Sequence, residues 1–187
     1  GMSGEAAAAG YGAATRIEQV VLLPVLGINT AIISIIAQNY GAGNYERIKE
    51  SYYTAIKYAL FIMILSGILI FITSGIIPTF FSDNLEVNHF GKKYLQISAF
   101  VLPAYPIFFL SNGFFMALKK SENALVTNFF RNILLPVITF YVATYFMADF
   151  NTFFWIWVVS NWIFSISLLL IVLYYIRKKL NTLSAIV

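Results

Sequence analysis

Long apolar runs alternate with short polar segments along the chain. Five stretches contain no Asp, Glu, Lys or Arg: residues 19–45, 58–82, 94–118, 132–148 and 150–176. A helix needs roughly 20 mostly apolar residues to cross the hydrocarbon core of a bilayer. Four of the stretches reach that length, and the mostly apolar residues 125–130 extend the remaining one across a single arginine. We therefore predict five transmembrane helices, at about residues 18–40, 54–80, 94–118, 124–147 and 151–176.

The pattern within the runs favours helices over membrane strands. Strands of a membrane barrel need roughly ten residues of alternating polarity, whereas FIMILSGILIF at residues 61–71 is apolar on every side. A helix satisfies its own backbone hydrogen bonds, so such a segment can lie in lipid. The predicted fold class is an all-α polytopic transmembrane helical bundle.

Composition supports the same class. Hydrophobic residues make up 60% of the chain and charged residues 11%, whereas soluble domains carry roughly 25% charged residues. No hydrophilic domain interrupts the apolar runs, so we expect the function to lie in or across the bilayer. The net charge of +4 comes from residues that flank the spans and indicates no nucleic-acid partner; with no cysteines, the chain forms no disulfide.

Basic residues are distributed unevenly between the two sides of the predicted bundle. The more basic side carries Arg47, Lys49, Lys57, Lys119, Lys120, Arg177, Lys178 and Lys179. The other side carries Arg16, Lys92 and Lys93. Because cytoplasmic flanks are enriched in Lys and Arg, the first side is predicted to be cytoplasmic. The expected protein is a multi-pass protein of the cell (inner) membrane with its C-terminus in the cytoplasm and its N-terminus outside.

A polar segment, AQNYGAGNYERIKE at residues 37–50, separates the first two spans. The residues expected to form this hinge are Gln38, Asn39, Gly41, Gly43 and Asn44. The two glycines permit a tight reversal with positive φ, and the asparagine after them is a candidate N-cap for the next helix. A nucleotide-binding loop would need a Gly-Lys-Ser/Thr ending or a preceding strand, and neither is present.

Few charged or amide side chains fall within the predicted spans. Glu18 is the only carboxylate at that depth, and acids inside a membrane are functional candidates by default; an interfacial ion pair with Arg16 is the alternative. Arg131 is the only basic residue inside a span, where it either snorkels to the interface or contacts a substrate. The amides that either pair between helices or line a pathway include Asn29, Asn112 and Asn128.

The remaining sequence gives no sign of catalysis. No set of His, Asp or Glu has catalytic or metal-ligand spacing, so we predict no enzyme, no metal site and no cofactor. Residues 1–17 are too short and glycine-rich for a span, and Gly1 before Met2 reads like the remnant of a tag. We expect the tail of a preceding helix and its loop there, then the five-helix region at 18–180 and a cytoplasmic tail at 181–187.

Several of these segments together resemble multidrug and toxic compound extrusion (MATE) transporters. RIEQVVLLPVLGINTAIISIIAQNYGAGNYERIK resembles the second helix of a lobe in that family, with its AQNYGAGN pattern. FFMALKKSENAL at residues 114–125 resembles the cytoplasmic turn between the fourth and fifth helices of a lobe, FFRNILLPVITFYV the next helix, and YYIRKKL the cytoplasmic end of the last. The best fit is to helices eight to twelve, in the C-terminal lobe of a twelve-helix, two-lobe transporter.

The resemblance implies a function and partners. It implies a secondary-active exporter of small amphiphilic or cationic substrates, coupled to H⁺ or Na⁺ antiport, with Glu18 as the candidate for the coupling ion. The partners would be the lipid bilayer and an N-terminal lobe or a second copy. The alternatives are a truncated or stand-alone membrane protein without transport activity, at most an interaction module, and a flippase of lipid-linked substrates from the same superfamily.

Overall fold

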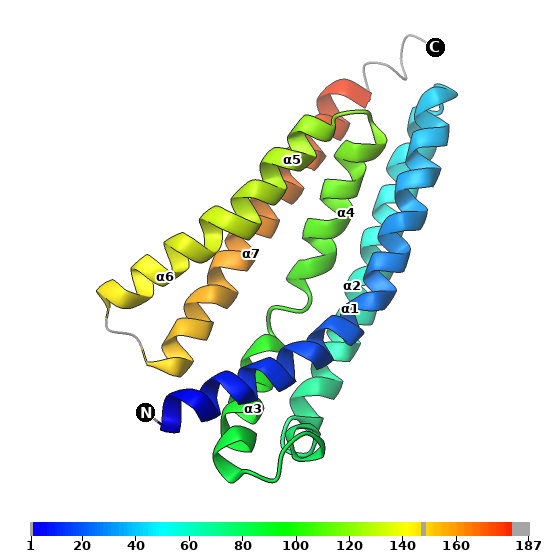
Figure 1. Cartoon of the computed structure of the whole chain (residues 1–187). Coiled ribbons are helices and arrows are strands. Elements are labelled where there is room, and N and C mark those ends of the chain that lie inside the picture. The colour runs from blue at the N-terminus through cyan, green and yellow to red at the C-terminus, as the bar shows by residue number, and fades with distance from the viewer. Residues whose placement is uncertain (1, 147–148, 181–187) are drawn as a thin grey trace.

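The computed structural model describes residues 2–146 and 149–180. Gly1, the tail predicted at 181–187 and the last residue of the span predicted at 124–147 lie outside the described residues. Every regular element in the described ranges is helical, as Figure 1 shows. The fold class predicted from the sequence, an all-α helical bundle, is confirmed.

The chain forms seven α-helices and three short turns of other helix types within the described residues. The α-helices are α1 (Met2–Gly41), α2 (Tyr45–Thr73), α3 (Leu85–Ser98), α4 (Ala104–Ala117), α5 (Ser121–Phe129), α6 (Leu135–Tyr145) and α7 (Phe150–Tyr175). The short elements are a 3-10 helix, η1 (Ile77–Phe80), and two π-helices, η2 (Phe130–Leu134) and η3 (Ile176–Leu180). Four segments are long and apolar enough to cross a membrane: Gly4–Gly41, Tyr45–Thr73, Ser121–Tyr145 and Asn151–Lys178.

The helices pack around α4. Figure 1 shows α1 and α2 side by side along one edge of the bundle, and α7 beside the continuous rod of α5, η2 and α6 on the other. Between them, α4 contacts α1, α2, α5 and α7, and nearly all of its side chains are buried. The N-terminal part of α1 packs against α3. The core of the bundle therefore lies along α4, and α1 packs against both α3 and α4.

The N-terminal segment differs from the prediction. We expected a helix tail and a loop over residues 1–17, but α1 continues without interruption from Met2 to Gly41. Its alanines favour helix, and Gly10 lets the backbone approach α3 closely. A Cβ on Gly10 would lie 2.6 Å from the carbonyl oxygen of Val87 and 2.9 Å from the amide nitrogen of Gly91. One of the glycines that suggested a loop, Gly10, instead allows α1 and α3 to pack closely.

The third predicted span, 94–118, is wrong as a continuous helix. It is broken between Ser98 and Ala104, where the chain forms turn-like hydrogen bonds from Val101 N to Ser98 O (2.9 Å) and from Ala104 N to Val101 O (2.9 Å). Pro103 has no backbone N–H, and its ring obstructs a regular helix in the preceding turn. A proline inside a helix commonly causes only a kink, whereas here the structure separates α3 from α4.

A side chain from α7 stabilises this break. The indole N–H of Trp162 donates a hydrogen bond to the carbonyl oxygen of Phe100 (2.8 Å). A carbonyl left unpaired in hydrocarbon costs several kcal/mol, by an order-of-magnitude estimate. The tryptophan therefore satisfies a backbone group that the break releases from the helix.

The hinge between α1 and α2 uses one glycine rather than two. Gly43 has a positive φ of 73°, as predicted, but Gly41 is the last residue of α1 and has no positive φ. The reversal is closed by the backbone N–H of Asn44, which donates to the carbonyl of Asn39 (2.8 Å). The tight turn therefore depends on the conformational freedom of Gly43 alone.

The side chains of the hinge differ from the prediction. Asn44 occupies the N-cap position of α2, but its side chain makes no capping bond. Gln38 and Asn39 donate back along α1, to Ser34 Oγ (3.2 Å) and to the carbonyl of Ile35 (2.8 Å). These amides therefore stabilise the end of α1 rather than link the two helices.

A side-chain cap begins α7. Asp149 accepts hydrogen bonds from the backbone N–H of Thr152 (3.1 Å) and from its hydroxyl. Both bonds favour the ionised carboxylate, so they hold the pKa of Asp149 below its usual value. This cap fixes where the chain re-enters the bundle.

Candidate functional site

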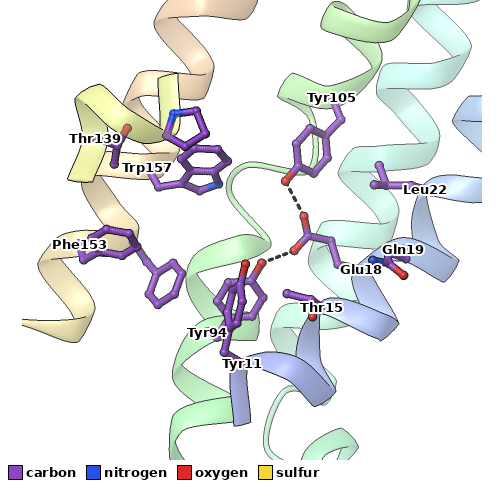
Figure 2. A pocket seen from close by; sticks show the side chains of 12 residues that line it. Tyr11, Thr15, Glu18, Gln19, Leu22, Tyr94, Tyr105, Thr139, Phe153 and Trp157 are labelled. Carbon is purple, nitrogen blue, oxygen red and sulfur yellow. Dashed lines mark hydrogen bonds between the residues drawn. The ribbon is translucent and has the colours of Figure 1, made fainter. Parts of the chain in front are cut away.

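A buried carboxylate lies where α1 passes the break between α3 and α4. Glu18 is only 7% exposed. The hydroxyl of Tyr94 donates to its Oε2 (2.6 Å), and the hydroxyl of Tyr105 donates to its Oε1 (2.5 Å), as Figure 2 shows. Each carboxylate oxygen thus has one phenol donor.

The broken helix explains how two tyrosines reach the same carboxylate. Tyr94 lies near the end of α3 and Tyr105 near the start of α4. Glu18 therefore bridges the two halves of a discontinuous helix. Transporters commonly place ion and substrate sites at discontinuous helices near the middle of the membrane, so this geometry suits ion binding.

Glu18 does not form the interfacial ion pair considered as its alternative. Arg16 is exposed, and no ion pair joins it to Glu18 in the described parts of the chain. The direct partners of the carboxylate are neutral hydroxyls. A carboxylate in such surroundings can accept a proton or a small cation without first breaking a salt bridge.

Arg131 lies among aromatic rings instead of snorkelling to the interface. Its guanidinium carbon is 4.2 Å from the ring centre of Phe108, 5.0 Å from that of Tyr105 and 5.5 Å from that of Phe109. Such cation–π contacts contribute about 2 kcal/mol when the cation is desolvated. Arg131 is placed there by the π-helical turn η2. It contacts the ring of Tyr105, whose hydroxyl donates a hydrogen bond to Glu18.

The predicted asparagines are separate from this site. Asn112 donates to the carbonyl of Ala124 (3.3 Å) and to Thr127 Oγ1 (3.1 Å), and so links α4 to α5. Asn128 bonds to the same carbonyl within its own helix (2.9 Å). The Oδ1 atom of Asn29 is buried and has no hydrogen-bond partner among the described residues. These three side chains do not line the cavity beside Glu18.

A cavity of about 380 Å³ opens beside Glu18, between α1, α3, α4, α6 and α7. Its polar lining includes Thr15, Gln19 and Thr139 in addition to the carboxylate, and aromatic side chains form much of the rest. Figure 2 shows Phe153 and Trp157 on the side opposite Glu18. One acid, neutral polar groups and aromatic faces suit a small cation or an amphiphile that carries one. The described residues contain no cluster of three or more potential metal ligands.

Sequence reasoning found Glu18 but missed its two tyrosine partners. Tyr94 and Tyr105 are eleven positions apart, about three helical turns, which places them near one face of a helix. They also lie on either side of Pro103. A carboxylate inside a membrane needs donors, so this spacing was a usable signal.

The fold and the site define a class of protein: a polytopic helical membrane protein with a buried acid beside a discontinuous helix, as in secondary transporters. The chain belongs to the MatE family of membrane transporters, whose family model matches residues 1–142. The function class predicted from the sequence, membrane transport, is confirmed at this level.

Two curated relatives are similar over most of this chain. A protein named "FAD transporter" from Shewanella oneidensis is 27% identical over 129 residues, which are 69% of this chain and 28% of the relative. The "Probable multidrug resistance protein YpnP" of Bacillus subtilis is 26% identical over 125 residues, which are 67% of this chain and 28% of the relative. The matched segment thus spans less than a third of each relative.

Solved structures share the fold. The Vibrio cholerae MATE transporter VcmN in its bent form superposes with a TM-score of 0.84 at 21% identity, over 96% of this chain and 40% of that one. A MOP superfamily transporter from Pyrococcus furiosus superposes with a TM-score of 0.85 at 21% identity, over 94% of this chain and 39% of that one. The described fold of this chain thus matches part of a larger helical fold.

Proposed function

We propose that this chain forms helices eight to twelve, in the C-terminal lobe of a secondary-active exporter, and that Glu18 binds the coupling ion. The observation that carries the proposal is the pair of hydrogen bonds from Tyr94 and Tyr105 to Glu18 across the helix break. The exporter would exchange small amphiphilic or cationic substrates for H⁺ or Na⁺ across the cell (inner) membrane.

The chemistry of the site supports ion exchange. When Glu18 is ionised, both phenols donate to it and offset part of the cost of burying its charge. When it takes a proton, one oxygen no longer needs a donor and that hydrogen bond weakens. A sodium ion would compete with the phenol hydrogens for the same oxygens. Either ion therefore changes the restraint between α3 and α4.

The cavity supports an amphiphilic substrate. Aromatic faces accept organic cations through cation–π contacts and apolar molecules through burial. Relatives are named for multidrug resistance and for FAD transport, so a cationic dye and FAD are both informative test substrates.

A complete pathway would need more protein than this chain. Transporters built from two repeats bind substrate between the repeats and alternate access by moving one against the other. We propose that an N-terminal lobe, or a second copy of the chain, supplies the other half of the pathway.

The test is efflux from cells that express the complete transporter containing this segment. Glu18→Gln keeps a similar shape and hydrogen-bonding groups but cannot exchange its charge for an ion, so we expect ion-driven efflux to fall at least tenfold. Glu86→Gln is the matched control, because Glu86 is an exposed acid in the first turn of α3; it should export normally.

Three outcomes would contradict this function. Efflux by Glu18→Gln equal to that of the unchanged protein would exclude Glu18 as the coupling residue. Robust efflux by the 187-residue chain alone, without self-association, would exclude the need for a second half. No efflux of either test substrate by the complete transporter would favour the interaction module or the flippase of lipid-linked substrates.

A further inference from the structure

An apolar groove lies between α2, α7 and the break that separates α3 from α4. It has a volume of about 550 Å³, and its lining includes Ile68, Phe71, Phe100, Trp155 and Trp162. The rings of Phe71 and Phe100 meet edge to face at 5.9 Å, and Phe100 lies 5.3 Å from Trp155. The lining offers almost no polar surface, so the groove suits a hydrocarbon chain.

A smaller polar cavity continues from one end of this groove. It has a volume of about 330 Å³ and shares three aromatic side chains with the groove: Phe71, Phe100 and Trp155. Its lining adds Lys93, Gln96 and Asn151. Together the two cavities form one site with an apolar body and a cationic mouth, which we call the lipid groove.

The polar groups at the mouth are not paired with one another. No carboxylate lies within salt-bridge distance of Lys93 in the part of the chain that the structure describes. The Oδ1 atom of Asn151 is buried and accepts no hydrogen bond from any residue that the structure describes. Asp149, the acid nearest in sequence, uses its Oδ1 atom to cap α7. Among the described residues, the mouth therefore offers Lys93 as a cation that no carboxylate neutralises.

We propose that the lipid groove binds an anionic phospholipid, such as phosphatidylglycerol. Lys93 would hold the phosphate, and an acyl chain would lie in the groove against Trp155 and Trp162. The cationic mouth and apolar body match the two parts of such a lipid. In the predicted orientation the lipid belongs to the outer leaflet.

This assignment accounts for a feature of the sequence that the transport function leaves unexplained. Lys92 and Lys93 are basic residues on the side predicted to face outward, where the orientation rule expects few of them. Binding to a lipid phosphate would explain why Lys93 occurs on this side despite the orientation rule. The lipid groove shares no lining residue with the cavity beside Glu18, so it is a separate site.

Tryptophan fluorescence can measure the binding directly. In a Trp157→Phe background, the two remaining tryptophans, Trp155 and Trp162, both line the groove. The purified chain is reconstituted in phosphatidylcholine vesicles that contain either brominated phosphatidylglycerol or brominated phosphatidylcholine, whose bromines quench nearby indoles. One lysine close to an anionic lipid favours binding by about fivefold. We therefore expect quenching to show that the groove binds phosphatidylglycerol about fivefold more tightly than phosphatidylcholine.

Matched variants test the contact with the headgroup and the occupancy of the groove separately. Lys93→Gln should reduce the preference to near parity, whereas Lys92→Gln, with the same loss of charge at a position that lines neither cavity, should retain it. Ile68→Phe should reduce quenching by both lipids because the larger side chain occupies the groove. Leu69→Phe, on the adjacent exposed position of α2, should not.

Three results would overturn the proposal. Equal quenching by the two lipids in the background protein would show that the mouth selects no anion. A preference that survives Lys93→Gln would place the headgroup elsewhere. An absence of quenching by either lipid would show that no lipid enters the groove.

Discussion

At the scale of single residues, most buried polar side chains in the described residues serve helix packing, whereas Glu18 and Thr139 face a cavity. Glu18 was found because a carboxylate in an apolar run is conspicuous. Tyr94 and Tyr105 were not, because tyrosine is common at membrane interfaces and their spacing of about three helical turns was not connected with the carboxylate. The position of Arg131 could not be predicted either, since its ring partners come from α4, a different segment of the chain.

Tyr52 and Ser111 form a second buried contact, which tests the packing of α2 on α4. Their hydroxyl oxygens lie 2.8 Å apart, and both side chains are fully buried. Interhelical hydrogen bonds in membranes contribute about 0.6 kcal/mol on average. We expect Tyr52→Phe to lower the free energy of unfolding in denaturing detergent by about 1 kcal/mol, because it leaves the serine hydroxyl without a partner.

A double-mutant cycle supplies the control. Adding Ser111→Ala to Tyr52→Phe should cost less than the sum of the two single changes, since the pair is then removed together. Strict additivity would mean that the two hydroxyls contribute no coupling energy and that α2 is held on α4 by apolar packing alone.

At the scale of elements, hydropathy located the spans well because the cost of placing charge in lipid is large. The first, second, fourth and fifth spans each correspond to a continuous apolar helical segment. The break in the third span was not located, because proline at position 103 is compatible with both a kink and a separation. The helical start of α1 was missed because Gly10 was weighed for its weak helix propensity, and its packing against α3 depends on a contact distant in sequence.

Gly10 provides the corresponding test. Gly10→Ala places a methyl group against the backbone of α3, and overpacking of this kind costs about 1–3 kcal/mol. We expect a lower unfolding temperature in detergent for this variant. Gly12→Ala is the control on the same helix, because nothing lies within 4 Å of a Cβ there and alanine favours helix. Equal stability of the two variants would show that α1 and α3 are not in close contact.

At the scale of the whole molecule, the charge distribution predicts an orientation that the fold by itself does not test. The turn at Ser121 joins α4 to α5 at one end of the bundle, and the segment before α3 lies at the other end. The basic residues place the first turn in the cytoplasm. The orientation thus depends on sequence alone and needs a measurement.

Single cysteines can test it, because the chain has none of its own. Ser121→Cys and Glu86→Cys both replace exposed residues. In intact cells, a membrane-impermeant thiol reagent should label the cysteine at 86 and leave the one at 121 unlabelled until the cells are opened. The reverse pattern would invert the topology and assign the lipid groove to the inner leaflet.

The bond from Trp162 to the carbonyl of Phe100 also limits how the bundle can move. In hydrocarbon no water is present to replace the indole as a donor, so separating α7 from the break leaves both groups unpaired. The low-energy motion is therefore one in which α7 and the start of α4 shift as a single body. Because Tyr105 is on α4, a change of ligand at Glu18 would then be transmitted to α7, although Glu18 itself lies on α1.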